Sequence, residues 1–232
     1  FDEITKVPRP SKKEGKIRAF LLDFAREHHL DAKEDVTGNI VISKAATQGF
    51  ESSPGVILQS HMDMVCEKNS DVIHDFENDP IETYIDGEWV RARGTTLGAD
   101  NGIGMAASLA VLASDNLQHG PLEALFTVDE ETGLTGAFGM KEGFISGDYL
   151  LNLDSEDEAE IFIGCAGGID TTSTFTYKPT MTPADYFYFR VSISNLQGGH
   201  SGSDINKGLG NANKILARFL CRCSKKYDMV LC

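Results

Sequence analysis

The chain has 232 residues, of which 41% are hydrophobic and 24% charged, so it has the composition of a globular protein with one large domain or one domain and part of a second. Its net charge of −14 disfavours nucleic-acid and membrane partners, because an acidic surface repels phosphate groups. No apolar run is long enough to span a bilayer, and the first residues lack a signal-peptide pattern.

The first predicted element is an amphipathic helix over residues 14–30, where apolar side chains recur at helical spacing. An Asp-Gly pair predicts a β-hairpin turn at Gly87, and an alanine- and leucine-rich run predicts a buried helix over residues 101–114. Short apolar or β-rich runs predict strands over residues 39–43, 56–60, 122–128 and 149–153. Strands that alternate with helices to about residue 165 predict an α/β sheet layered with helices.

After about residue 166 the pattern changes. Residues 187–194 alternate between apolar and polar side chains, as in an antiparallel strand with one solvated face. Residues 204–225 have the pattern of a helix. We therefore expect a second, α+β unit over residues 166–232, of which the chain contains a part.

Acidic and histidine side chains follow three of the predicted buried strands. His61 and Asp63 come at the end of the second strand, Glu130 and Glu131 after the third, and Asp154 after the fourth. Functional sites in open α/β sheets are built at the carboxyl ends of strands. So many carboxylates could not stay ionised together without cations, and one histidine with several carboxylates suits zinc, manganese or cobalt.

A glycine-rich run, residues 94–104, places Asp100 at the start of the predicted buried helix, where it could bridge two metal ions. Each motif has an ordinary explanation when taken alone. His61 and Asp63 could be a hydrogen-bonded pair, Asp100 a helix cap, and Glu130 part of a solvated acidic turn. The glycine run lacks the lysine of a phosphate-binding loop. The occurrence of all these motifs in series favours the metal site.

Residues 60–69 and 95–104 together resemble metallopeptidase family M20, and within it the Xaa-His (aminoacyl-histidine) dipeptidase branch, also called peptidase D. The similarity extends over essentially the whole chain. It implies a zinc-peptidase-like mixed sheet with helices on both faces and an inserted α+β lid domain. Residues 1–165 would be the amino-terminal part of the catalytic domain, and residues 166–232 part of the lid and dimerisation domain.

The resemblance also implies a set of metal ligands. One zinc ion would be held by His61 and Asp154, and a second by Glu131. Asp100 would bridge the two ions, for which Mn²⁺ or Co²⁺ could substitute. The family takes one further histidine from late in the catalytic domain, and no histidine follows His200. We therefore expect the chain to be the amino-terminal portion of a longer protein, with activity a property of the intact molecule.

Two residues would be catalytic and one would bind substrate. Glu130 would be the general base, and Asp63 would orient the imidazole of His61. His200, in the segment 198–202, would contact substrate, often across a dimer. A glycine turn after a strand is the alternative explanation of that segment.

The expected function is two-metal hydrolysis of dipeptides with a free amino terminus, of the Xaa-His or carnosine type. The alternatives are another M20 amidohydrolase (a tripeptidase, carboxypeptidase or deacylase) and a non-catalytic metal-binding module. The expected partner is a second copy of the chain, bound through the lid. Five cysteines, an odd number without the spacing of a disulfide framework, favour a reducing compartment and thus the cytoplasm.

Overall fold

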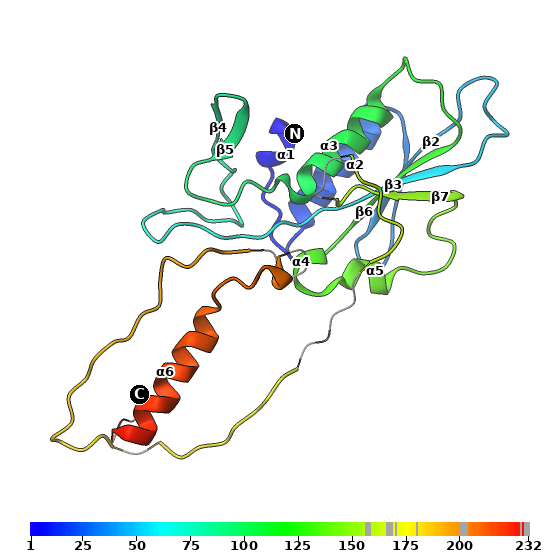
Figure 1. Cartoon of the computed structure of the whole chain (residues 1–232). Helices are drawn as coiled ribbons and strands as arrows, with labels where there is room; N and C mark the ends of the chain where they lie inside the picture. The colour runs from blue at the N-terminus through cyan, green and yellow to red at the C-terminus, as the bar shows by residue number, and fades with distance from the viewer. Residues whose placement is uncertain are drawn as a thin grey trace. The chain divides into compact units, whose positions relative to one another are not determined.

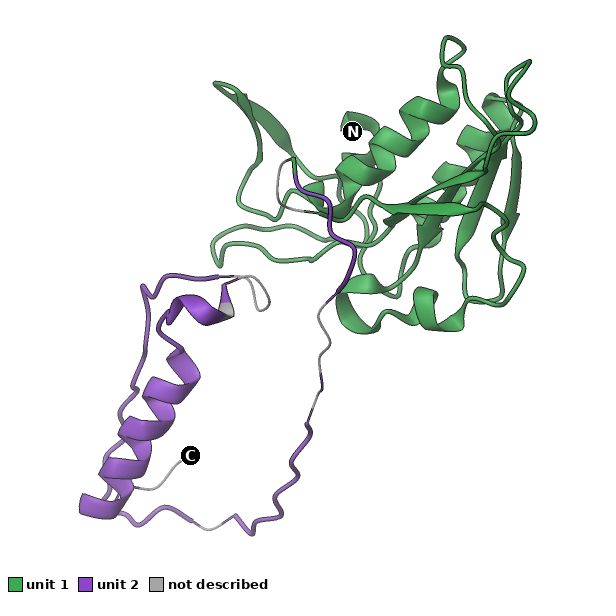
Figure 2. Ribbon diagram, turned by 45° about the vertical axis from the view of Figure 1, so that its right-hand side comes forward, with its two compact units in different colours: residues 1–159 green, residues 160–232 purple. Residues whose placement is uncertain are grey.

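The computed structural model describes residues 1–155, 159–165, 169, 171–179, 181–199, 204–227 and 229. The chain divides into two compact units, Phe1–Ala159 and Glu160–Cys232, which Figure 2 colours green and purple. Each unit is described here by itself. No helix among the described residues is both long and apolar enough to cross a membrane.

The first unit is built on a five-stranded mixed sheet with the strand order β1-β2-β6-β3-β7 (Figure 1). Strands β3, β6 and β7 run parallel, whereas β1 and β2 are antiparallel to their neighbours. The carboxyl ends of the three parallel strands therefore lie at one edge of the sheet, where sites form in α/β proteins. The strands are β1 (Asp31–Glu34), β2 (Ile40–Lys44), β3 (Val56–His61), β6 (Leu122–Thr127) and β7 (Tyr149–Asn152).

Both faces of this sheet are covered, as its alternating apolar side chains require. The helices α2 (Gly15–Glu27) and α3 (Ala99–Ala113) pack against one face, where Ile40, Ile42 and Phe126 are buried. The strand side chains that point to the other face of the sheet form a smaller cluster there, which packs against the segment that follows α5 (Thr135–Gly139). The members of that cluster are Val41, Ile57, Leu125, Met140, Phe144 and Ile145. The predicted α/β fold is confirmed.

Three short elements complete the first unit. Helix α1 (Asp2–Thr5) precedes the first long helix, and α4 (Glu130–Gly133) follows β6. The predicted hairpin is present as β4 (Thr83–Asp86) and β5 (Trp89–Ala92), joined through Gly87 at a φ of 63°. The sequence did not predict β1, because its Asp-Ala-Lys-Glu residues are exposed and lack the apolar pattern of a buried strand.

The second unit differs from its prediction. The prediction of a strand over residues 187–194 is wrong, because these residues are irregular and no described residue of this unit pairs with them. An isolated strand is not stable without partners. The helix expected over residues 204–225 is divided: a 3₁₀ turn, η1 (Ile205–Lys207), ends at Gly208 with a φ of 70°, and α6 (Ala212–Lys226) begins only after the Asn211 cap.

Candidate metal centre

The imidazole of His61 is the centre of the polar cluster. His61 ends β3 and is only 1% exposed. Its Nε2 lies 2.9 Å from Asp100 Oδ1, 3.8 Å from Asp154 Oδ1 and 4.0 Å from Glu130 Oε2. These residues come from the ends of three parallel strands and from the start of α3, so the fold brings together groups far apart in sequence.

Three of the clustered residues could hold a metal ion. Ligand atoms of His61, Asp100 and Glu131 all lie within 4.8 Å of one another. Asp154, the fourth predicted ligand, has its carboxylate beside the same imidazole nitrogen. His200, predicted to contact substrate, lies outside the described residues.

The other imidazole nitrogen of His61 is held from behind. Its Nδ1 lies 3.1 Å from the backbone carbonyl of Asp63 and 3.3 Å from Oδ1 of the same residue. A carbonyl oxygen can only accept a hydrogen bond, so Nδ1 carries the proton. In the neutral ring this leaves the Nε2 lone pair directed at the carboxylates, which is the tautomer a metal ligand needs.

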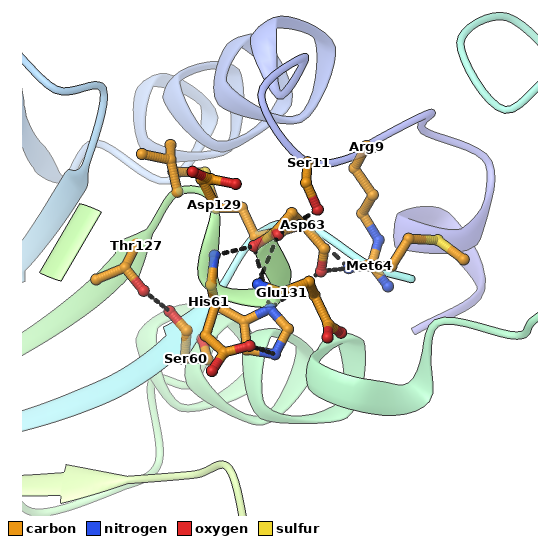
Figure 3. Close-up of polar contacts among 12 residues, drawn as sticks. Arg9, Ser11, Ser60, His61, Asp63, Met64, Thr127, Asp129 and Glu131 are labelled. Carbon is orange, nitrogen blue, oxygen red and sulfur yellow. Dashed lines mark hydrogen bonds and ion pairs between the residues drawn. The ribbon is translucent and has the colours of Figure 1, made fainter. Parts of the chain in front are cut away.

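Asp63 has a second structural role that the sequence did not predict. Its carboxylate accepts hydrogen bonds from the backbone N–H groups of Glu130 (3.0 Å) and Glu131 (3.2 Å), at the start of α4 (Figure 3). One fully buried carboxylate therefore fixes both the imidazole and the two glutamates. The strand-end positions of these residues predicted their proximity, but not this backbone contact.

The carboxylates in this cluster compete for protons. Burial and the hydrogen bond with Asp100 raise the pKa of Asp154 to about 7. Burial also raises the pKa of Glu130 and of Glu131. By contrast, the hydrogen bond from His61 lowers the pKa of Asp100. Like charges at this spacing cannot all remain ionised at neutral pH unless positive charge joins them.

His61 and Asp63 form the positively and negatively charged pair at the base of the cluster. Burial alone would lower the pKa of His61, but its hydrogen bonds with Asp100 and Asp63 raise it to about 10. Burial would raise the pKa of Asp63, but hydrogen bonds from His61 and Ser11 lower it to about 2. In the metal-free site a proton on His61 thus supplies positive charge to the surrounding carboxylates. A divalent cation bound to the same imidazole would neutralise those carboxylates better than the proton does, so the donor set fits such a cation.

The chain around Asp100 is not regular helix. Gly98 precedes it with a φ of 72°, and Asp100 itself is extended, with φ −82° and ψ 116°. The peptide bond between Asp100 and Asn101 is cis. Asp100 was predicted to head the helix, and the structure has it within the first turn but with its backbone turned out of helical geometry.

Sequence reasoning missed three polar residues that lie behind the cluster, Arg9, Ser11 and Glu14. Arg9 and Glu14 are only 2% and 6% exposed. Burial lowers the pKa of Arg9 to about 10, which leaves the guanidinium charged at neutral pH. Arg9 and Ser11 lie in a segment without the periodicity of a helix or strand, and Glu14 is a polar residue at the start of the predicted helix, so the sequence assigned none of them a role in the site.

A cavity of about 230 Å³ lies beside the cluster, on the side of Glu130 and Asp154. Its remaining wall is largely apolar and includes Leu134, Met140 and Leu150. A lining that combines two acidic groups with apolar side chains would suit a small organic molecule with a polar reacting centre.

Comparison with known proteins identifies the family. The model of peptidase family M20/M25/M40 matches residues 57–204, which contain every residue of the polar cluster. The chain belongs to peptidase family M20/M25/M40. This assignment confirms the family that the motifs around His61 and Asp100 predicted.

Two relatives match all or nearly all of the chain. It is 51% identical over 231 residues to the cytosol non-specific dipeptidase of Escherichia coli (strain K12), covering 100% of this chain and 48% of that protein. Aminoacylhistidine dipeptidase from Vibrio alginolyticus has 49% identity and a TM-score of 0.71, over 98% of this chain and 46% of that one.

A third relative matches more distantly. A tripeptidase from Staphylococcus aureus has 25% identity and a TM-score of 0.55, over 66% of this chain and 41% of that one. The chain thus spans about half the length, or less, of these relatives.

Proposed function

We propose that the protein containing this chain is a metal-dependent dipeptidase that uses two divalent cations, zinc in the first instance. The observation that carries the proposal is the convergence of His61, Asp100 and Glu131, whose ligand atoms lie within 4.8 Å of one another. One ion would be held by His61 and Asp154 and the other by Glu131, with Asp100 between them. The names of the relatives, two of them dipeptidases, support dipeptides as the substrate class.

Glu130 is the proposed general base. Bound divalent cations supply a water of lowered pKa and polarise the scissile carbonyl. The Glu130 carboxylate accepts the proton of the attacking water and then donates it to the departing amine. Burial raises the pKa of Glu130, which favours both steps near neutral pH. The Asp63 carboxylate holds the glutamate's backbone in place throughout, through the 3.0 Å hydrogen bond from its N–H.

A substrate panel tests the substrate class. The complete protein, loaded with zinc, is given Xaa-His dipeptides such as carnosine, other dipeptides, a tripeptide, an N-acetylated dipeptide and an N-acyl amino acid. We expect kcat/KM to be highest for unblocked dipeptides and to include Xaa-His substrates. Preference for the tripeptide would favour a tripeptidase, the activity of a more distant relative. Cleavage of the acyl amino acid alone would favour a deacylase, and no cleavage at all a metal-binding module.

Zinc affinity should rise with pH. In the metal-free site the pKa of His61 is raised to about 10 and that of Asp154 to about 7, so both groups bind protons that a cation must displace. Between pH 7 and pH 9 we expect about one proton released per first zinc ion, and therefore about a tenfold gain in affinity per pH unit. Below pH 7 the slope should steepen as Asp154 also becomes protonated. Titration calorimetry in buffers of different ionisation enthalpy measures the proton count, and a flat profile would contradict this assignment.

We further propose that residues 1–165 belong to the catalytic domain and residues 166–232 to a lid that forms a homodimer. The apolar side chains exposed along the second unit, such as Phe175, Phe187 and Phe189, support a partner for this unit. His200 would reach substrate from it. A cytoplasmic location is supported by the name of the Escherichia coli relative and by four described cysteines that are all free. Light scattering tests the dimer by comparing the complete protein with a variant in which a short linker replaces residues 166–232.

A further inference from the structure

Polar residues of the segment between α1 and α2 contact three of the four loops that carry the candidate metal centre. These residues are Arg9, Ser11 and Glu14, and they are called the amino-terminal brace below. Burial of a charged side chain costs free energy unless the charge is paired or hydrogen-bonded. Each residue of the brace finds its partner on a loop of the site, so its contacts lie where the ligands are positioned.

Arg9 joins two of these loops through a single guanidinium. Its Nη1 donates hydrogen bonds to the backbone carbonyls of Met62 (3.0 Å) and Asp63 (2.8 Å), directly after His61. Its Nη2 donates to the carbonyl of Gly98, two residues before Asp100. Arg9 therefore links the loop of His61 to the loop of Asp100. The Nε2 atom of His61 and the Oδ1 atom of Asp100 lie 2.9 Å apart.

The glycine-rich loop leaves room for this guanidinium. A Cβ at position 98 would lie 2.5 Å from Nη2 of Arg9, and a Cβ at position 102 would lie 2.9 Å from the same atom. Gly98 also has a φ of 72°, a backbone conformation that residues with a side chain rarely adopt. Part of the reason for the glycines around Asp100 is therefore the approach of Arg9.

Ser11 adds a contact to the loop after His61, and Glu14 extends the brace to a third loop. Ser11 Oγ donates a 2.7 Å hydrogen bond to Asp63 Oδ2, the carboxylate that orients His61 (Figure 3). Glu14 Oε1 accepts a 3.0 Å hydrogen bond from the backbone N–H of Asp129, the residue before Glu130. The brace thus contacts the chain within two residues of His61, Asp100 and Glu130.

We infer that Arg9, Ser11 and Glu14 are positioning residues that hold three of the four ligand-bearing loops at the spacing a divalent cation needs, before the cation binds. The inference rests on the proposed function, because it assumes that a cation binds at His61. Arg9 is the central member, since a planar guanidinium with several fixed donors can join carbonyls of two loops, whereas a lysine ammonium is a compact charge without that fork.

The test compares the complete protein with its Arg9→Lys variant. The zinc dissociation constant is measured by competition with a chromophoric chelator, and the melting temperature is recorded with and without zinc. We expect zinc affinity to fall by about 10- to 100-fold, the usual effect of losing a group that orients metal ligands. The rise in melting temperature on zinc addition should shrink accordingly. Arg26→Lys is the matched control, because Arg26 is exposed and pairs only with Asp23 among its described ionic partners.

The outcomes separate the brace from the proposed function. One outcome is that the Arg9→Lys variant binds zinc as tightly as the parent protein, while its melting temperatures with and without zinc are lowered by the same amount. In that case Arg9 is merely structural and the inference is overturned. If the parent protein itself binds no zinc, the proposed function fails first and the inference falls with it.

Should Arg9→Lys not fold, Ser11→Ala decides, since it removes one hydrogen bond to Asp63 and no buried charge. For that variant we expect about a 3- to 10-fold loss of zinc affinity, which corresponds to one hydrogen bond. An unchanged zinc dissociation constant in Ser11→Ala would overturn the inference.

Discussion

Replacement of Glu130 by glutamine should lower kcat for dipeptide hydrolysis by about 10²- to 10⁴-fold, the usual contribution of a general base. Glutamine keeps the size of the side chain and the backbone N–H that donates to Asp63, but it cannot accept the proton of the attacking water. KM should change little, and the variant should still bind zinc. Steady-state kinetics and metal analysis of the same preparation measure both quantities.

A matched control is Glu142→Gln, which removes an exposed carboxylate outside the cluster. That variant should retain the activity of the parent protein. If Glu130→Gln were as active as the parent, the general base would have to be another group. If it lost its zinc together with its activity, Glu130 would be a ligand, and its assignment would have to be exchanged with that of Glu131.

Replacement of Asp100 by asparagine should weaken zinc binding more than any other single change in the cluster. Asp100 is the carboxylate proposed to lie between the two ions, and its Oδ1 is 2.9 Å from the His61 imidazole. The loss of a group that merely orients ligands costs about 10- to 100-fold in metal affinity, so loss of this ligand should cost more than about 100-fold. Zinc content after gel filtration should fall from about two ions per molecule of the complete protein to fewer than one.

Asp115→Asn is the control for this substitution, because Asp115 is an exposed acid just after the other end of the same helix. It should keep both ions and full activity. Retention of two zinc ions by Asp100→Asn would contradict a bridging role. Loss of only one ion would instead assign Asp100 to a single site.

The sequence predicted the sheet well because its buried strands are short apolar runs with polar residues at their ends. His61, Glu130 and Asp154 each follow such a run, and parallel pairing of β3, β6 and β7 brings their ends together. Helix α3 was also predicted, since its alanine- and leucine-rich pattern is that of a buried helix. The family resemblance added roles to these residues.

Other features depend on contacts that no local pattern records. Arg9 reaches carbonyl groups more than 50 residues away in the chain, and a backbone carbonyl leaves no trace in the sequence as a partner. The strand expected near Phe189 failed for a related reason. Alternation indicates that a segment could lie on a sheet, but the strand forms only where another strand pairs with it.

The most direct test of the central claim is an anomalous difference map at the zinc edge from crystals of the complete protein grown with zinc. The account predicts two peaks about 3.5–4 Å apart, as in other two-metal hydrolytic sites. One peak should lie about 2.0–2.1 Å from Nε2 of His61, the usual zinc–imidazole distance. Asp100 should lie between the peaks. Peaks elsewhere, or none beside His61, would contradict the metal centre and the peptidase mechanism built on it.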